Sequence, residues 1–130
     1  LIEINRSLTK HIDNLAPYTY PAILNRFLEL IELHYKQEHH VAYYANLLNI
    51  TATTLWLQTM QYMETTPLKL IHNRLLKEAM HLLRLGANPI KTTLIELGFE
   101  DSATFSHFFK KQTNMSPSAY QKKHLPHKKT

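Results

Sequence analysis

The sequence predicts an all-α fold of about seven helices, and three observations support that prediction. The 130 residues contain only two glycines, Gly86 and Gly98. No sustained alternation of apolar and polar residues indicates a strand, whereas the longer segments repeat apolar residues at the spacing of a helix. Apolar residues make up 44% of the chain, which is enough to bury a core in one domain or in two small ones.

The predicted helices follow one another with short breaks. Residues 1–20 fit either a linker or a short amphipathic helix, and Pro21 fits the first position of a helix with one apolar face. Turn and cap residues then mark the remaining helices. In the first unit these are 41–48, which ends at Asn49, and 52–63, which Thr51 caps; the helix at 67–85 follows and ends at Gly86. In the second unit they are 89–97, which ends at Gly98, a helix capped by Asp101 or Ser102, and a last helix that begins at Ser116 and Pro117.

One supersecondary unit occurs twice along the chain. Each copy has a short helix, a tight turn, a second helix and a Ser/Thr-Pro pair that begins a further helix. Matching residues are 49 apart before the turn, as for Val41 and Ile90, and 50 apart after it, as for Leu55 and Phe105. We therefore predict two helix-turn-helix subdomains, at 21–73 and 86–123, joined by a long linker helix at 66–85, with a basic tail at 124–130.

Positive charge gathers in the C-terminal part of the chain. The formal net charge is +5; residues 102–130 hold six lysines and no acidic residue, whereas the first 101 residues hold nine basic and ten acidic ones. This asymmetry favours a polyanionic partner, although a solvated basic tail has the same composition. No apolar run approaches the roughly 18 residues that a membrane span needs, so we expect no membrane partner.

Catalysis and metal binding find no support in the sequence. The chain has no cysteine, and its paired histidines have no acidic partner at ligand spacing. Asp101, Ser106 and His107 include the residue types of a hydrolase triad, but neighbours on one helix cannot adopt triad geometry unaided. We therefore expect no enzyme, with no catalytic residue, no metal and no cofactor.

The second unit has the features that reading a DNA major groove requires. Such a helix needs apolar anchors on one side, short polar side chains near its start for base edges, and cations for phosphates. The three phenylalanines of its second helix are the anchors. The base-reading candidates are Ser102, Ala103, Thr104, Ser106 and His107, and in the first unit Thr53, Thr54 and Gln61; the phosphate candidates are Lys110, Lys111 and Lys91. We therefore expect double-stranded DNA as the partner.

These residues resemble the DNA-binding domain of the AraC/XylS family of bacterial transcription regulators. The resemblance covers about Phe27 to Lys123 and is strongest in five runs of the second unit: Pro89–Lys91, Glu96–Asp101, Phe105–Ser106, Phe108–Lys111 and Met115–Tyr120. It implies two helix-turn-helix subdomains bridged by one helix and set against successive major-groove segments on one face of the duplex. It also implies transcriptional control, often through contact with RNA polymerase.

The resemblance further implies that sensing belongs to a separate domain. Because the chain begins at Leu1 rather than Met, we expect a piece of a longer cytoplasmic protein, with a sensor domain or dimerisation partner outside it.

The second helix of the first unit departs from the family pattern. Leu57 occupies a position where the family usually has Arg, and no charged residue lies between Thr51 and Met63. The departure favours either packing in a shifted register or poor reading of bases. Trp56 shares a face with Met60 and Met63, and it is interpreted as a packing residue rather than as one that stacks on bases.

Two functions follow as hypotheses. The leading one is sequence-specific binding of DNA by the DNA-binding domain of a bacterial transcription regulator. The alternative is a protein-interaction domain on a drifted helix-turn-helix scaffold, with weak or non-specific DNA binding.

Overall fold

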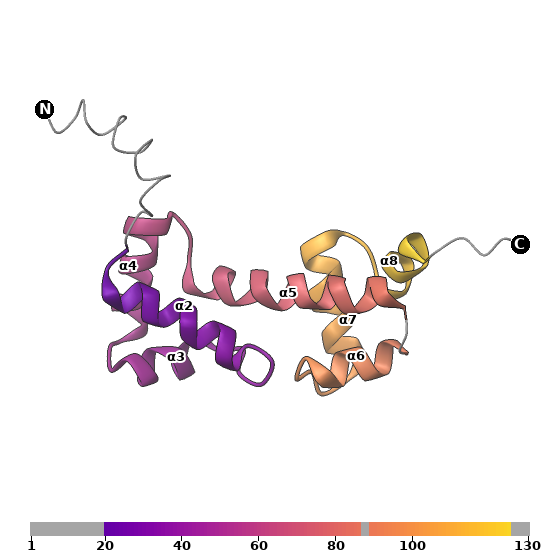
Figure 1. The fold of residues 1–130 in the computed structure, drawn as a ribbon, viewed down its shortest axis with the longest axis horizontal. Helices are drawn as coiled ribbons and strands as arrows, with labels where there is room; N and C mark the ends of the chain where they lie inside the picture. The colour runs from indigo at the N-terminus through magenta and orange to yellow at the C-terminus, as the bar shows by residue number, and fades with distance from the viewer. Residues whose placement is uncertain (1–19, 87–88, 126–130) are drawn as a thin grey trace, which may run out of the picture.

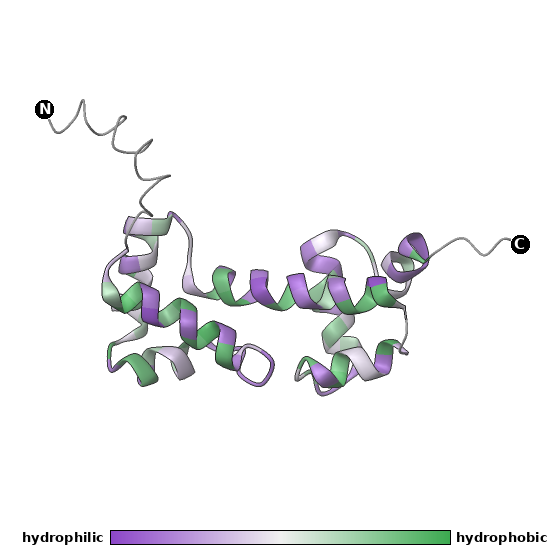
Figure 2. Cartoon of the chain, viewed as in Figure 1, coloured by the Kyte–Doolittle hydropathy of each residue, from purple (hydrophilic) through white to green (hydrophobic). Residues whose placement is uncertain are grey.

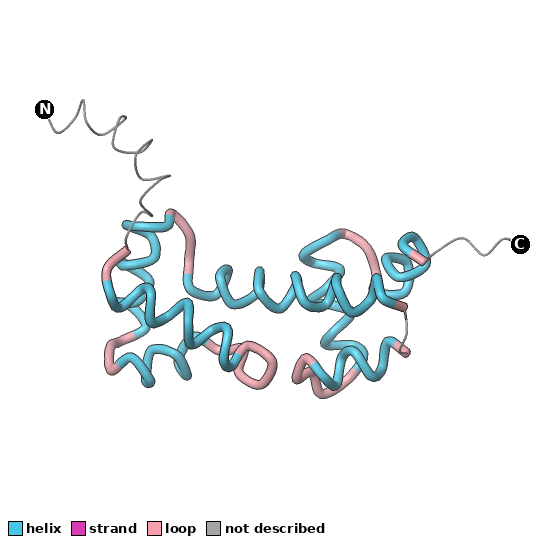
Figure 3. The backbone as a smooth tube through the Cα atoms, in the orientation of Figure 1, coloured by secondary structure: helices cyan, strands magenta, loops and turns pink. Residues whose placement is uncertain are grey.

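The computed structural model describes residues 20–86 and 89–125, so the expectations for residues 1–20 and 124–130 fall mostly outside it. Within the described residues every regular element is an α-helix (Figure 3). The seven are α2 (Ala22–His34), α3 (Val41–Leu48), α4 (Ala52–Met63), α5 (Pro67–Leu85), α6 (Ile90–Glu96), α7 (Ser102–Thr113) and α8 (Pro117–His124).

The helices form two lobes at opposite ends of α5 (Figure 1). The first lobe contains α2, α3, α4 and the start of α5, and the second lobe contains α6, α7, α8 and the end of α5. The predicted all-α architecture, with two helix-turn-helix units joined by a long helix, is confirmed. The subdomain boundaries at 21–73 and 86–123 stay predictions.

Side-chain caps determine where four helices begin. In each case the side-chain oxygen of the cap accepts a hydrogen bond from the backbone N–H three residues later: Thr51 from Thr54, Thr66 from Lys69, Asp101 from Thr104 and Ser116 from Ala119. Each bond satisfies one of the N–H groups that have no partner within the first helical turn. The prediction for Thr51 is confirmed, and Asp101 rather than Ser102 caps α7.

Two prolines lie one residue outside the positions predicted for them. Pro21 and Pro89 precede α2 and α6 with extended ψ angles of 148° and 152°, so these helices begin at Ala22 and Ile90. Proline fixes φ near its helical value but leaves ψ free, and here ψ places both residues in the cap position.

Left-handed residues end the helices at matching places in the two copies. Asn49 and Gly98 follow the first helix of each unit with φ of 63° and 82°. Glu64 and Asn114 follow the second helix with φ of 57° and 65°. The two units therefore share the left-handed residues at their helix ends, and the second turn is one residue longer, as the sequence repeat predicts.

A single apolar cluster runs through both lobes. Hydrophobic and hydrophilic bands succeed one another along α5 (Figure 2), which buries Ile71, Leu75, Ala79 and Leu83 at four-residue intervals. The second lobe adds packed aromatic rings, such as the edge of one ring against the face of the other for Phe109 and Tyr120, at 5.3 Å between centroids. Because each buried side chain of this size contributes about 1.5–3 kcal/mol, this cluster is the main source of stability.

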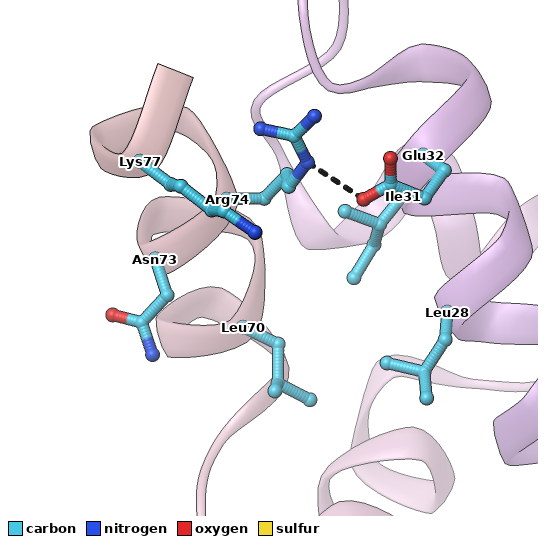
Figure 4. A pocket seen from close by; sticks show the side chains of 7 residues that line it. All are labelled: Leu28, Ile31, Glu32, Leu70, Asn73, Arg74 and Lys77. Carbon is cyan, nitrogen blue, oxygen red and sulfur yellow. Dashed lines mark hydrogen bonds and ion pairs between the residues drawn. The ribbon is translucent and has the colours of Figure 1, made fainter. Parts of the chain in front are cut away.

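Arg74 pairs α5 with α2 beside a surface pocket (Figure 4). Its Nε donates to Glu32 Oε2 at 2.6 Å, and its guanidinium lies 4.2 Å from the centroid of the Tyr35 ring. On α5 itself, Glu78 lies one helical turn away, 3.6 Å from the guanidinium. A bidentate or stacked guanidinium fixes geometry more firmly than a flexible ammonium, so Arg74 orients α2 against the linker helix.

The two lobes also contact each other away from α5. The loop after α2 lies against the turn after α6, where His39 Nε2–H donates to the Leu97 carbonyl at 2.9 Å and the His39 ring packs on Phe99 at 5.0 Å. A Cβ atom added at Gly98 would overlap the Lys36 carbonyl oxygen. We call this the inter-lobe contact.

The packing of this contact outweighs its ion pair. Lys36 Nζ lies 3.2 Å from Glu96 Oε2, but both side chains are more than one-third exposed. Exposed pairs of this kind contribute about 0–1 kcal/mol. The close approach at Gly98 and the partly buried His39 therefore define the contact.

Replacing Gly98 should show how much of the free energy of unfolding depends on the close approach of Gly98 to the Lys36 backbone. Gly98→Ala places a Cβ at a φ of 82° and against the Lys36 backbone, so we expect the free energy of unfolding to fall by about 2 kcal/mol or more. Asn49→Ala is the matched control, because Asn49 has a φ of 63° at the same place in the first unit and already carries a Cβ. We expect it to cost less than about 1 kcal/mol. Equal losses in urea denaturation would contradict this account.

Candidate nucleic-acid interface

Helix α7 has one face in the core and one in solvent. Phe105 and Phe109 are fully buried, and Phe108 packs on His72 with 5.2 Å between ring centroids. The opposite face exposes six of the predicted site residues, Ser102, Ala103, Thr104, His107, Lys110 and Lys111, while Ser106 is partly buried. The structure thus brings together short polar groups at the start of the helix and two cations in its last turn.

The start of α7 is shaped by its cap. The Asp101 carboxylate accepts from the Thr104 backbone N–H at 2.8 Å, and this bond, with a second one from the Thr104 side chain, holds the pKa of Asp101 below its ordinary value. The Thr104 hydroxyl is therefore engaged in the cap. Ser102 and His107 are the side chains best placed to donate hydrogen bonds outward from this face.

Helix α4 keeps the register of α7, so of the two alternatives drawn from the sequence the shifted register is wrong. Leu55 and Thr59 are fully buried, at the places that Phe105 and Phe109 hold in α7. The Thr59 hydroxyl donates to the Trp56 carbonyl at 3.1 Å, which lets a polar residue occupy a core position without an unsatisfied group. Trp56 lies outside the core, because 44% of it is exposed, and its assignment as a packing residue stays a prediction.

The outward face of α4 carries different chemistry. Thr53, Thr54 and Gln61 are exposed as candidates, and Leu57 lies among them with 55% of its surface in solvent. Residues 50 apart are equivalent in the two second helices, so Leu57 corresponds to His107. One helical turn later, Met60 corresponds to Lys110 and Gln61 to Lys111. The two second helices therefore present equivalent positions with unlike side chains. Comparing the exposed positions of the two copies would have shown this from the sequence.

Lys91 lies outside both second helices. It is exposed in the first turn of α6, the first helix of the second unit. Nothing in the described part of the chain joins it to the cations of α7.

The described residues contain neither a group of three or more His, Cys, Asp and Glu side chains that could hold a metal ion nor a helix long and apolar enough to cross a membrane.

Comparison with known proteins agrees with the geometry of the two units. A family model described as a helix-turn-helix domain matches residues 44–123. The HTH-type transcriptional activator RhaS of Escherichia coli O139:H28 is 30% identical over 111 residues, which cover 85% of this chain and 38% of that protein. The chain belongs to the AraC family of helix-turn-helix DNA-binding domains. It spans well under half the length of this relative.

Solved structures share the fold. The C-terminal domain of AraT, a response regulator from Geobacillus stearothermophilus, superposes with a TM-score of 0.78 at 23% identity, covering 87% of this chain and 94% of that one. A DNA-binding transcriptional dual regulator from Escherichia coli K-12 gives a TM-score of 0.63 at 21% identity, covering 79% and 98%.

Acid should weaken the fold through the histidine of the inter-lobe contact. Burial lowers the pKa of His39 below its ordinary 6.5, although the Leu97 carbonyl acts in the opposite direction. Between the lowered pKa and 6.5 the unfolded chain binds more protons than the folded chain. The free energy of unfolding therefore falls as the pH falls through that window. Burial lowers the pKa of His72 as well, with the same sign.

We expect His39→Gln to flatten this dependence in urea denaturation between about pH 7.5 and pH 5.5. Asn49→Ala changes no titratable group and is the control, which should keep the wild-type slope. If His39→Gln kept the wild-type dependence of unfolding free energy on pH, a group other than His39 would take up the protons on unfolding.

Proposed function

We propose that this chain binds double-stranded DNA in a sequence-dependent way, as the DNA-binding domain of a bacterial transcription regulator. Helices α7 and α4 enter successive segments of the major groove, whose width admits one helix. The observation that carries the proposal is the exposed face of α7, with short polar groups at its start and Lys110 and Lys111 in its last turn.

Each group on this face has a role in the proposal. Base edges are contacted from α7 by Ser102, Ala103, Thr104, Ser106 and His107, and from α4 by Thr53, Thr54 and Gln61. Lys110, Lys111 and Lys91 contact phosphates, which position the protein without reading sequence. The net charge of +5 supports the same polyanionic partner.

The whole protein is a further part of this proposal. The relative RhaS is a transcriptional activator of which this chain matches 38%. By likeness to it, we propose a cytoplasmic regulator with a sensor or dimerisation domain and with RNA polymerase as a second partner.

The alternative function is a protein-interaction domain on the same scaffold. The apolar, uncharged outer face of α4 favours it. In that case DNA binding would rest on charge alone and be insensitive to sequence.

Selection from random DNA separates the two functions. We expect the 130-residue chain to enrich a site with two preferred segments about one helical turn apart, and to bind it in fluorescence anisotropy at least about 1,000-fold more tightly than unrelated duplexes. Micromolar, sequence-blind binding that is lost at physiological salt would contradict the proposal and favour the protein-interaction domain.

Replacing both lysines of α7 with alanine tests the phosphate contacts. Lys110→Ala with Lys111→Ala should weaken binding to selected and unrelated duplexes alike, by about tenfold or more, and reduce the log-log salt slope by about 0.9 for each contact. The charge-matched control is Arg26→Ala with Lys77→Ala, on α2 and α5, which should leave both nearly unchanged. A loss confined to selected sites would assign the two lysines to base reading instead.

A further inference from the structure

The outer face of α4 is uncharged and partly apolar, whereas the outer face of α7 is polar and cationic. We define it as Thr53, Leu57, Met60 and Gln61, in which Met60 and its neighbour Gln61 lie one helical turn after Leu57 and Thr53 lies one turn before it. Leu57 is 55% and Met60 36% exposed, while Leu55 and Thr59 on the opposite side are buried. The apolar residues of this face are therefore not part of the core.

The place of this face in the fold indicates what covers it. Its residues occupy the positions that Ala103, His107, Lys110 and Lys111 hold in α7, the face proposed to enter a major groove. Both helices have a capped start and a left-handed residue at the end, so the two faces are built on the same frame. No acidic side chain lies between Thr51 and Met63, so nothing on this helix repels phosphates.

The major groove offers one apolar group to such a face. Guanine, cytosine and adenine are told apart there by their hydrogen-bonding atoms, whereas thymine also carries a C5 methyl group. The Leu57 side chain and the thioether of Met60 complement a methyl group and leave guanine and cytosine edges without polar partners. Gln61 has an amide that can bond adenine at both N6 and N7, in the base pair that carries the thymine.

We propose that α4 recognises thymine methyl groups, with Leu57 as the central contact, so that the segment of the binding site under α4 is rich in A·T pairs. This inference rests on the proposed function. It gives the two helices different tasks: α7 combines polar base contacts with phosphate contacts, and α4 reads sequence through apolar contact.

The test replaces thymidine with deoxyuridine, which removes only the methyl group. The DNA segment under α4 is located first by Ala52→Cys, an exposed position in a chain without other cysteines, labelled with an iron chelate that cleaves nearby DNA. Deoxyuridine is then placed in that segment of the selected site, and the dissociation constant of the 130-residue chain is measured. We expect about fourfold weaker binding for each methyl contacted, equivalent to about 0.8 kcal/mol.

Leu57→Ala completes a double-mutant cycle. Alanine favours helix and the position is exposed, so the variant should fold. It should bind the thymidine site more weakly and lose most of its sensitivity to deoxyuridine. His107→Ala, the equivalent change in α7, should keep that sensitivity.

Two results would overturn the inference while the proposed function stands. One is tight, sequence-specific binding whose dissociation constant does not change when deoxyuridine replaces thymidine in the α4 segment. The outer face of α4 would then be a site for a protein partner. The other is equal sensitivity in the wild type and Leu57→Ala, which would remove Leu57 as the contact. Absence of any sequence preference in the initial selection would overturn the proposed function itself, and this inference with it.

Discussion

The approach of the Gly98 turn to the Lys36 carbonyl sets how the two helix-turn-helix units sit relative to each other. Helix α5 has 19 residues and therefore a length of about 28 Å, close to the roughly 34 Å between successive major-groove segments on one face of DNA. A linker helix of this length sets the separation of the lobes along its axis, but the orientation of each lobe depends on its packing. The inter-lobe contact adds a second connection, with His39 bonded to the Leu97 carbonyl and packed on Phe99, so the two second helices are held as one unit.

Comparing the two copies of the repeat separates the residues that the fold requires from the exposed residues that differ between the units. The caps Thr51 and Asp101, the buried pair in each second helix and the left-handed residue at its end are shared. These features decide where a helix begins, which face it buries and where it ends. The exposed positions are free of those constraints, so Leu57 and His107 can differ without disturbing the frame.

Most of the architecture is predictable from the sequence because it depends on local chemistry. Thr51 and Asn49 mark a helix start and a helix end through hydrogen bonding and tolerance of positive φ, and both act as expected. The register of α4 is not predictable from hydrophobicity, because the larger apolar side chain, Trp56, is exposed while Thr59 is buried with its hydroxyl satisfied by the backbone. The inter-lobe contact joins groups far apart in the chain, such as the His39 ring and the Leu97 backbone carbonyl, and no periodic pattern marks them. The exposure of the α7 candidates follows from the buried phenylalanines, but their contacts with DNA remain a proposal.

The unlike faces of α4 and α7 have a physical consequence for the proposed complex. Contacts between lysines and phosphates release counterions, so the share of the binding free energy from Lys110 and Lys111 falls steeply as salt rises. Contacts between Leu57 and a methyl group release water rather than ions, so their share is nearly independent of salt. As salt increases, discrimination at the α4 segment therefore persists while overall affinity falls. An apolar reading helix beside a cationic one thus keeps sequence preference when electrostatic attraction is screened.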